Sequence, residues 1–82
     1  MKIKIGKAED NDFIVNDPHV SRHHACLVRE DHGCWLLEDL GSTNGTFVNG
    51  SQIVMKRITP TDKIYLGTGY VLNLTEALKY NN

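Results

Sequence analysis

Five side chains suited to binding an anion lie at the edges of polar loops: Lys7, Ser21, Arg22, Thr43 and Asn44. Two of them are cations, two carry hydroxyl groups, and Asn44 carries an amide. A phosphomonoester has about two negative charges and three acceptor oxygens, so it requires cations together with hydroxyl and backbone N–H donors. Loops at one end of a β-sandwich cluster, so these groups can converge on one anion, although their spacing alone leaves convergence open.

A metal site is a second interpretation, because five residues of ligand type lie close together: His23, His24, Cys26, His32 and Cys34. If the chain turns next to His32, Cys34 faces about position 29 and Cys26 faces about position 37. The two sulfur atoms are then several residues apart along the ladder, at about 3.3 Å per residue. The chain also has no Cys-x-x-Cys motif to start a zinc site. We therefore predict that it holds no metal.

A catalytic triad is a third interpretation, since Ser21, His24 and Asp39 supply the three residue types. The sequence contains no strand-to-helix nucleophile elbow and no helix terminus that could form an oxyanion hole. His24 stands where a loop meets a strand. We predict that it is hydrogen-bonded inward and holds the shape of the loop, and that the protein is not an enzyme.

The elements that must position these residues are short strands, because apolar and polar residues alternate in brief runs. The runs cover residues 2–5, 13–15, 24–30, 34–38, 46–48, 51–54, 63–66 and 70–74. The alternation directs inward Ile3, Ile5, Ala25, Leu27, Trp35, Leu37, Ile64 and Leu66, with Val20 buried in a loop. No segment before Thr75 has a helical apolar period, and residues 75–80 suffice for one helical turn. The pattern predicts an all-β sandwich or barrel.

Two Asn-Gly pairs have different predicted roles. Asn49-Gly50 is flanked by short β-prone runs on both sides, which is the signal of a tight hairpin. Asn44-Gly45 follows Gly41, Ser42 and Thr43, which are turn residues rather than a strand. We therefore expect Asn44 to be held in a polar loop, the kind of segment that often carries function.

Length and composition describe one domain with a modest core. The chain has 82 residues and a formal net charge of −1, which gives no overall attraction to nucleic acid or to an anionic membrane. No apolar run approaches the roughly 18 residues that span a bilayer, and the N-terminus lacks the apolar region of a signal peptide. Two cysteines form no disulfide framework. These features predict a cytoplasmic location, with an anchor possible outside this segment.

Three blocks of sequence, taken in order, resemble the forkhead-associated (FHA) domain family. The first contains Gly6-Lys7, Asn11-Asp12 and residues 16–25, which include Ser21-Arg22-His23-His24. The second is residues 39–50, and the third is residues 62–67. Their order and spacing agree with the family from Ile3 to Leu74, which is far more specific than one short motif. FHA domains recognise phosphorylated motifs.

The resemblance implies an antiparallel β-sandwich of the FHA (SMAD/FHA-like) type whose loops bind a phosphothreonine peptide. It implies that Ser21 contacts the phosphate beside Arg22, that Thr43 lines the site, and that Asn44 fixes the peptide backbone. Lys7 stands where the family usually has Arg, so it keeps the charge but loses the bidentate fork. The matches at Gly6, His24, Asn49 and Gly50 imply structural support of the site.

The resemblance also sets the expected boundaries and partners. We expect residues 1–74 to form the phosphopeptide-binding domain and residues 75–82 to be a C-terminal tail or the start of a linker. The sandwich is expected to be trimmed at its N-terminus, with a sheet edge exposed near Ile3. The expected partner is a phosphothreonine protein in signalling or assembly, bound without a cofactor, nucleic acid or direct membrane contact, by a domain of a larger protein. The alternative is a domain that binds an unphosphorylated partner or itself.

Overall fold

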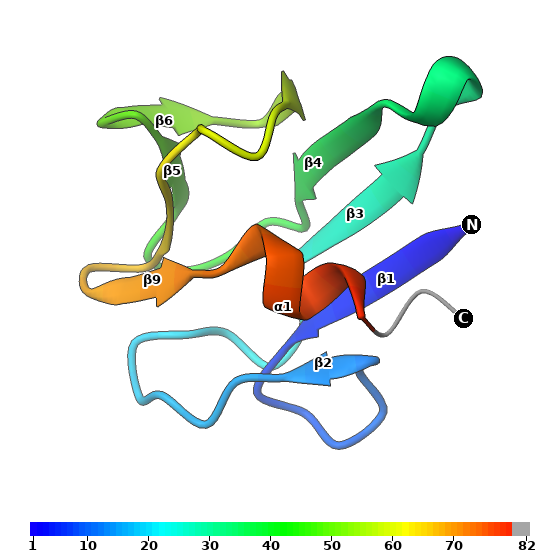
Figure 1. Cartoon of the computed structure of the whole chain (residues 1–82). Coiled ribbons are helices and arrows are strands. Elements are labelled where there is room, and N and C mark those ends of the chain that lie inside the picture. The colour runs from blue at the N-terminus through cyan, green and yellow to red at the C-terminus, as the bar shows by residue number, and fades with distance from the viewer. Residues whose placement is uncertain (80–82) are drawn as a thin grey trace.

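Short strands dominate the computed structural model, which describes residues 1–79. Within that range there are nine strands, one 3-10 turn and one short helix (Figure 1). The strands are β1 (Lys2–Gly6), β2 (Phe13–Ile14), β3 (Ala25–Arg29), β4 (Trp35–Asp39), β5 (Thr46–Val48), β6 (Ser51–Ile53), β7 (Met55–Ile58), β8 (Ile64–Leu66) and β9 (Tyr70–Leu72). The 3-10 turn η1 (Asp31–Gly33) joins β3 to β4, and the helix α1 (Leu74–Leu78) follows β9.

The strands form two sheets, as the alternation predicted. The five-stranded sheet has the order β2-β1-β3-β4-β7, and the four-stranded sheet has the order β6-β5-β8-β9. All neighbouring strands are antiparallel except β1 and β2, which run parallel with Ile5 opposite Phe13. The prediction of an antiparallel β-sandwich is therefore confirmed, with one parallel pair at its edge.

The core lies between the sheets and consists of the side chains that the alternation directed inward. Ile3 and Leu27 face each other across β1 and β3, and Leu27 faces Leu37 across β3 and β4; all three are fully buried. The four-stranded sheet contributes Ile64 and Leu66, which are also fully buried. These predictions of buried residues are confirmed. Because side chains alternate along a strand, the residues between them point to the outer face of each sheet.

Strand β7 and helix α1 correct the sequence-based assignment. Strand β7 was not predicted, because Met55, Lys56 and Arg57 are all exposed at a sheet edge and show no alternation. The helix begins at Leu74, which was expected to end a strand, and the Asn73 side chain caps it by accepting from the Glu76 N–H at 3.0 Å. Ala77 is fully buried against the core, so the packed region continues past residue 74. The last three residues of the expected tail, 80–82, lie outside the described residues.

The expected sheet edge near Ile3 is only partly covered, although β1 lies between β2 and β3 in the order of strands. The two-residue strand β2 covers only Ile5 and Gly6. Beyond its reach, the Asp12 carboxylate accepts from the Lys4 N–H at 2.8 Å. A side chain thus takes the place of a neighbouring strand at this point of β1.

The two Asn-Gly pairs adopt the two predicted structures. Asn49 and Gly50 have φ angles of 53° and 88° and join β5 to β6 with Val48 opposite Ser51, which is a two-residue hairpin. Asn44 lies in the segment 40–45, which carries the chain from β4 in one sheet to β5 in the other. That loop therefore connects the two layers of the sandwich.

Candidate phosphopeptide site

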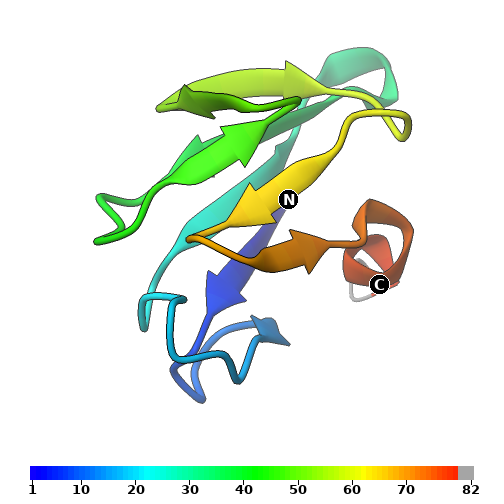
Figure 2. The same ribbon diagram turned by 90° about the vertical axis from the view of Figure 1, so that its left-hand side faces the viewer.

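Four loops meet at one end of the sandwich, namely residues 7–12, 15–24, 40–45 and 67–69. Figure 2 shows the green loop after β4 on its left side, above the cyan loop that precedes β3. Backbone hydrogen bonds join them directly. The Lys7 N–H donates to the Ser21 carbonyl at 3.0 Å, and the Gly67 N–H donates to the Gly45 carbonyl at 2.8 Å. The loops therefore form one bonded surface rather than independent segments.

Ser21 and Thr43 face each other across two of these loops. The Thr43 N–H donates to the Ser21 hydroxyl oxygen at 3.0 Å, although the residues are far apart in sequence. A serine hydroxyl can accept and donate at once. Because its oxygen accepts from Thr43, the Ser21 hydroxyl hydrogen remains available for an anion.

The exposed Asn44 side chain also bonds to this loop surface. Its side-chain NH₂ group donates to the His19 carbonyl at 2.9 Å. Its amide oxygen has no partner among residues 1–79 and can accept from a bound peptide. A side chain anchored at one end and open at the other is suited to holding a peptide backbone.

The two cations of the predicted set lie on adjacent loops and are both exposed. Two adjacent backbone hydrogen bonds hold these loops together. The Lys7 N–H donates to the Ser21 carbonyl, and the Ala8 N–H donates to the Arg22 carbonyl at 3.0 Å. Neither side chain forms a hydrogen bond or ion pair with another described residue. Their charges are therefore free to attract an anion at Ser21.

His24 is fully buried beneath these loops and bonded at both ring nitrogens. The Ser21 N–H donates to Nδ1 at 3.0 Å, so Nδ1 carries no hydrogen. The neutral ring then has its hydrogen on Nε2, which donates to the Gly45 carbonyl at 2.9 Å. The prediction that His24 is hydrogen-bonded inward is confirmed, and the two contacts join the Ser21 loop to the 40–45 loop.

Asp39 organises the 40–45 loop from its first turn. Its carboxylate accepts from the Gly41 and Ser42 N–H groups at 3.0 Å each, from the Ser42 hydroxyl at 2.5 Å, and from the Thr46 hydroxyl at 2.7 Å. The Ser42 oxygen in turn accepts from the Gly45 N–H at 3.0 Å. Partial burial opposes ionisation of the carboxyl group most strongly, but the four donors outweigh it and lower the pKa of Asp39. The charged form is thus the one that this loop requires.

Two glycines allow the loops to approach this closely. A Cβ atom at Gly6 would overlap the Arg22 carbonyl oxygen, and one at Gly67 would overlap the His19 carbonyl oxygen. Gly67 also has a φ of +68°, where other residues are strained. Gly6 was predicted to support the site, and a side chain there would force these two loops apart. Gly67 was not singled out as a supporting residue.

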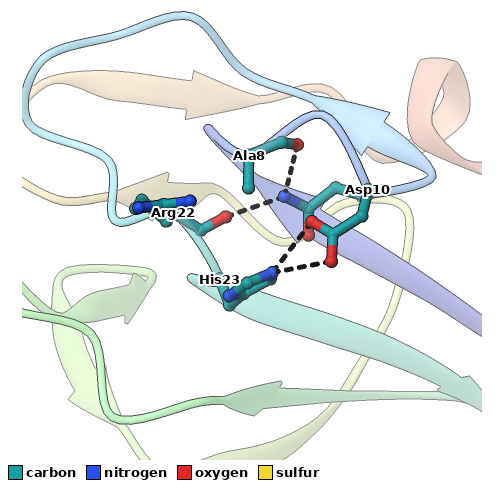
Figure 3. Close-up of polar contacts among 5 residues, drawn as sticks. Ala8, Asp10, Arg22 and His23 are labelled. Atoms are coloured by element: carbon teal, nitrogen blue, oxygen red, sulfur yellow. Dashed lines mark hydrogen bonds and ion pairs between the residues drawn. The ribbon is translucent and has the colours of Figure 1, made fainter.

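Asn11 bonds the first loop to the second, and the Asp10–His23 pair does the same at the surface (Figure 3). The Asn11 NH₂ group donates to the Ala8 carbonyl at 2.8 Å and to the Arg22 carbonyl at 2.7 Å. At the surface, His23 Nε2 lies 2.9 Å from a carboxylate oxygen of Asp10. Asn11, Asp39 and Ser42 were not predicted as supporting residues. An Asp followed three residues later by Ser, in a Gly-rich turn, was the available signal for the Asp39 network.

Asn49 and Gly50 are not brought to this end of the molecule. They follow the opposite end of β5, where the Asn49 NH₂ group donates to Asp62 at 3.0 Å and its oxygen accepts from the Lys63 N–H at 3.0 Å. Any support that they give to the site passes through the framework of β5.

The residues considered for a metal site and for a catalytic triad do not come together as either site would require. Cys26 is buried opposite Glu38 on the five-stranded sheet, whereas Cys34 is exposed after η1. Among residues 1–79, no group of three or more His, Cys, Asp or Glu side chains is placed to hold a metal ion. The carboxylate of Asp39 bonds to its own loop, as described above, while His24 bonds to Ser21 through the backbone N–H and not through the hydroxyl.

This fold and this loop surface define a β-sandwich binding domain, and comparison with known proteins identifies the family. The FHA domain model matches residues 3–73, and the chain belongs to this family. The chain is 33% identical over 66 residues to the FHA domain-containing protein FhaB of Mycobacterium tuberculosis, covering 80% of this chain and 39% of that protein. It is 38% identical over 65 residues to the ABC transporter ATP-binding/permease protein Rv1747 of the same species, covering 79% of this chain and 7% of the transporter.

A solved structure agrees in fold as well as in sequence. The N-terminal FHA domain of Rad53p from S. cerevisiae, in complex with a phosphothreonine peptide, has a TM-score of 0.74 and 27% identity, covering 85% of this chain and 59% of that one. The chain spans well under half of the two curated relatives described above. No helix within residues 1–79 is long and apolar enough to cross a membrane.

Proposed function

We propose that this domain binds a phosphothreonine-containing segment of a partner protein, without catalysis. One observation carries the proposal: the Ser21 hydroxyl accepts the Thr43 N–H and keeps its own hydrogen free, next to two cations without partners in the described chain. Hydroxyl, backbone and cationic donors at one point match the needs of a phosphomonoester. Family membership supports the same function, since FHA domains recognise phosphorylated motifs.

Each residue of the site has a separate role in this proposal. Ser21 donates to a phosphate oxygen, and Lys7 and Arg22 neutralise its charge from either side. Thr43 lines the site beside the phosphothreonine. Asn44 accepts from the peptide backbone through the amide oxygen that the domain leaves unpaired. Gly6 and His24 keep the loops in place.

Family membership and the free cysteines support a location for the domain and a role in a larger protein. We place the domain inside the cell, where protein kinases phosphorylate its partners and where Cys26 and Cys34 stay reduced. Its relatives carry the domain as part of longer proteins, so we propose that this one serves a larger signalling or assembly protein.

A peptide titration tests the proposed function. A library of phosphothreonine peptides is titrated against the domain beside the same peptides without phosphate and with phosphoserine. Binding should require the phosphate, and Ser21→Ala should weaken it about 10- to 100-fold, because a hydrogen bond to a charged group contributes roughly 1.5–3 kcal/mol. Asn44→Ala should weaken it by a similar factor. Ser51→Ala, an exposed serine on β6, is the matched control and should bind as the unmodified domain does.

Three results would count against the proposal. Equal affinity for phosphorylated and unphosphorylated peptides would favour the alternative interaction domain instead. Ser21→Ala binding as tightly as Ser51→Ala, with both variants folded, would remove Ser21 from the site. A partner that the domain captures equally before and after phosphatase treatment would lead to the same conclusion about phosphate dependence.

A further inference from the structure

An apolar row crosses the outer face of the four-stranded sheet. Phe47 on β5 pairs with Tyr65 on β8, and Tyr65 pairs with Val71 on β9. Their neighbours along each strand point into the core, so this row points outward. Tyr65 and Val71 are 36% and 57% exposed, and Phe47 is half-buried. Large apolar side chains thus occupy a sheet face that the described chain does not cover.

Part of this row forms a shallow groove of about 300 Å³. Its lining residues are Phe47, Gly50, Tyr65, Gly67 and Thr68. None of them is charged, and a glycine lies toward each end of the groove, Gly50 at one and Gly67, beside Thr68, at the other. A groove of this kind accommodates an extended segment that packs an aliphatic side chain against the two aromatic rings.

The groove is continuous with the proposed phosphopeptide site. Its Gly67 end touches the loops of that site, because the Gly67 N–H donates to the Gly45 carbonyl and the Gly67 Cα lies against the His19 carbonyl. Gly50 lies at the opposite end of β5. The path from Thr43 over Gly67 to Tyr65 is roughly 12–18 Å, from strand spacings and rises. An extended peptide covers that distance with four to six residues.

We infer that this groove binds an apolar side chain of the same partner segment, four to six residues from its phosphothreonine. The inference rests on the proposed function and adds a second specificity element to it. A stable interface with a second copy needs roughly 20–30 residues on each side, whereas five residues line the groove. A side chain tethered to an already bound phosphothreonine needs no such area, because the tether raises its effective concentration.

The test compares a short phosphothreonine peptide, with three residues on each side, to extended peptides. The extensions place Leu-x-Leu four to six residues beyond the phosphothreonine, on the N-terminal side in one peptide and on the C-terminal side in another. Matched peptides carry Ser in place of both Leu. The Leu extension on one side should tighten binding about tenfold relative to its Ser counterpart, which is the gain from partial burial of a leucine side chain.

Variants assign that gain to the groove. Tyr65→Ser should abolish the difference between Leu and Ser extensions while binding the short peptide as before. Val54→Ser removes an exposed apolar side chain outside the groove and should keep the full difference. The backbone amide NMR signal of Gly50, at the end remote from the phosphate, should shift with the Leu extension and stay unchanged with the short peptide.

The outcomes separate the inference from the function on which it rests. If the short phosphopeptide binds and neither Leu extension tightens binding, the groove is not a subsite and the phosphothreonine site stands. The same holds if the gain persists in Tyr65→Ser or if Gly50 does not shift. If the short phosphopeptide fails to bind at all, the proposed function is wrong and the inference is wrong with it.

Discussion

Replacing Asp39 with Asn should destabilise the domain and loosen the loop that carries Thr43 and Asn44. One carboxylate oxygen accepts two backbone N–H groups, and the other accepts two hydroxyls. An Asn side chain can present its oxygen to the N–H groups, but its NH₂ group then faces hydroxyls that must turn to accept. Charge-assisted hydrogen bonds are roughly twice as strong as neutral ones, which contribute about 1 kcal/mol.

From these contacts we expect Asp39→Asn to lower the free energy of unfolding by about 1–2 kcal/mol and Asp39→Ala by about 2–4 kcal/mol, the lower ends reflecting the partly exposed site. For a domain of this size, each kcal/mol lowers Tm by about 4–8 °C. Phosphopeptide affinity should fall about tenfold in Asp39→Ala. Reordering one loop residue on binding costs roughly 1–2 kcal/mol, which corresponds to that factor.

The pH dependence of stability tests whether the charge of Asp39 is what stabilises the loop. The pKa of Asp39 is lowered in the folded state, despite the opposing effect of burial, by donors from Ser42, Thr46 and Gly41. Its contribution to stability is therefore fully present above the ordinary aspartate pKa of about 3.9 and is lost as the pH falls through the folded value. Urea unfolding at pH 3 to 7 should show a gap between the unmodified domain and Asp39→Asn that is largest near pH 7 and begins to narrow below about pH 3.9.

Asp31→Asn is the matched control, since Asp31 is exposed in η1 at the opposite end of β3. It should leave both stability and affinity nearly unchanged. If Asp39→Asn unfolds at the same urea concentration as Asp31→Asn between pH 5 and 7, the Asp39 carboxylate does not stabilise the fold. If Asp39→Ala loses stability while its phosphopeptide affinity stays the same, the 40–45 loop does not contribute to binding.

Three further substitutions test other parts of the site. Lys7→Arg should tighten phosphopeptide binding several-fold by titration, because a planar guanidinium can contact two phosphate oxygens; unchanged affinity would show that position 7 does not reach the phosphate. Gly67→Ala should lower Tm by roughly 5–15 °C, because its φ of +68° and the His19 carbonyl exclude a Cβ atom, and a normal Tm would contradict that packing. Asp10→Asn should lower Tm slightly at pH 6 in low salt and by less at pH 3. The His23 hydrogen bond lowers the pKa of Asp10, and this stabilisation is lost as the carboxyl group protonates; a Tm difference that is the same at both pH values would exclude the pair.

The fold could be predicted from the sequence wherever one face of a strand is buried. Ile64 and Leu66 alternate with exposed residues, and the chain folds as the alternation requires. Strand β7 has no such pattern, since only Ile58 of its four residues is buried. The parallel direction of β2 was also not predictable, because a run of two residues specifies burial and not the direction of pairing.

The site could be predicted only as a set of residue types. The position of His24 at a loop–strand junction was enough to predict that it is hydrogen-bonded inward. Its hydrogen atom, however, is placed by the Ser21 N–H and the Gly45 carbonyl, which come together only when the loops pack. The Asp39 network depends in the same way on a loop conformation that no single residue specifies. Asn49 illustrates the opposite case. It belongs to the family motif in the sequence, yet it lies at the far end of the domain from the site.

The Gly45 carbonyl accepts from His24, next to β3, and from Gly67, next to β8, and these strands belong to different sheets. The binding surface therefore exists only while the two layers are docked in one register. A bound phosphopeptide would act as a cross-link between the layers, and it would stabilise their docking in proportion to the logarithm of its concentration. Affinity for the phosphopeptide thus becomes a measure of whether the whole sandwich is assembled, and a form with only one ordered sheet would have no site to offer.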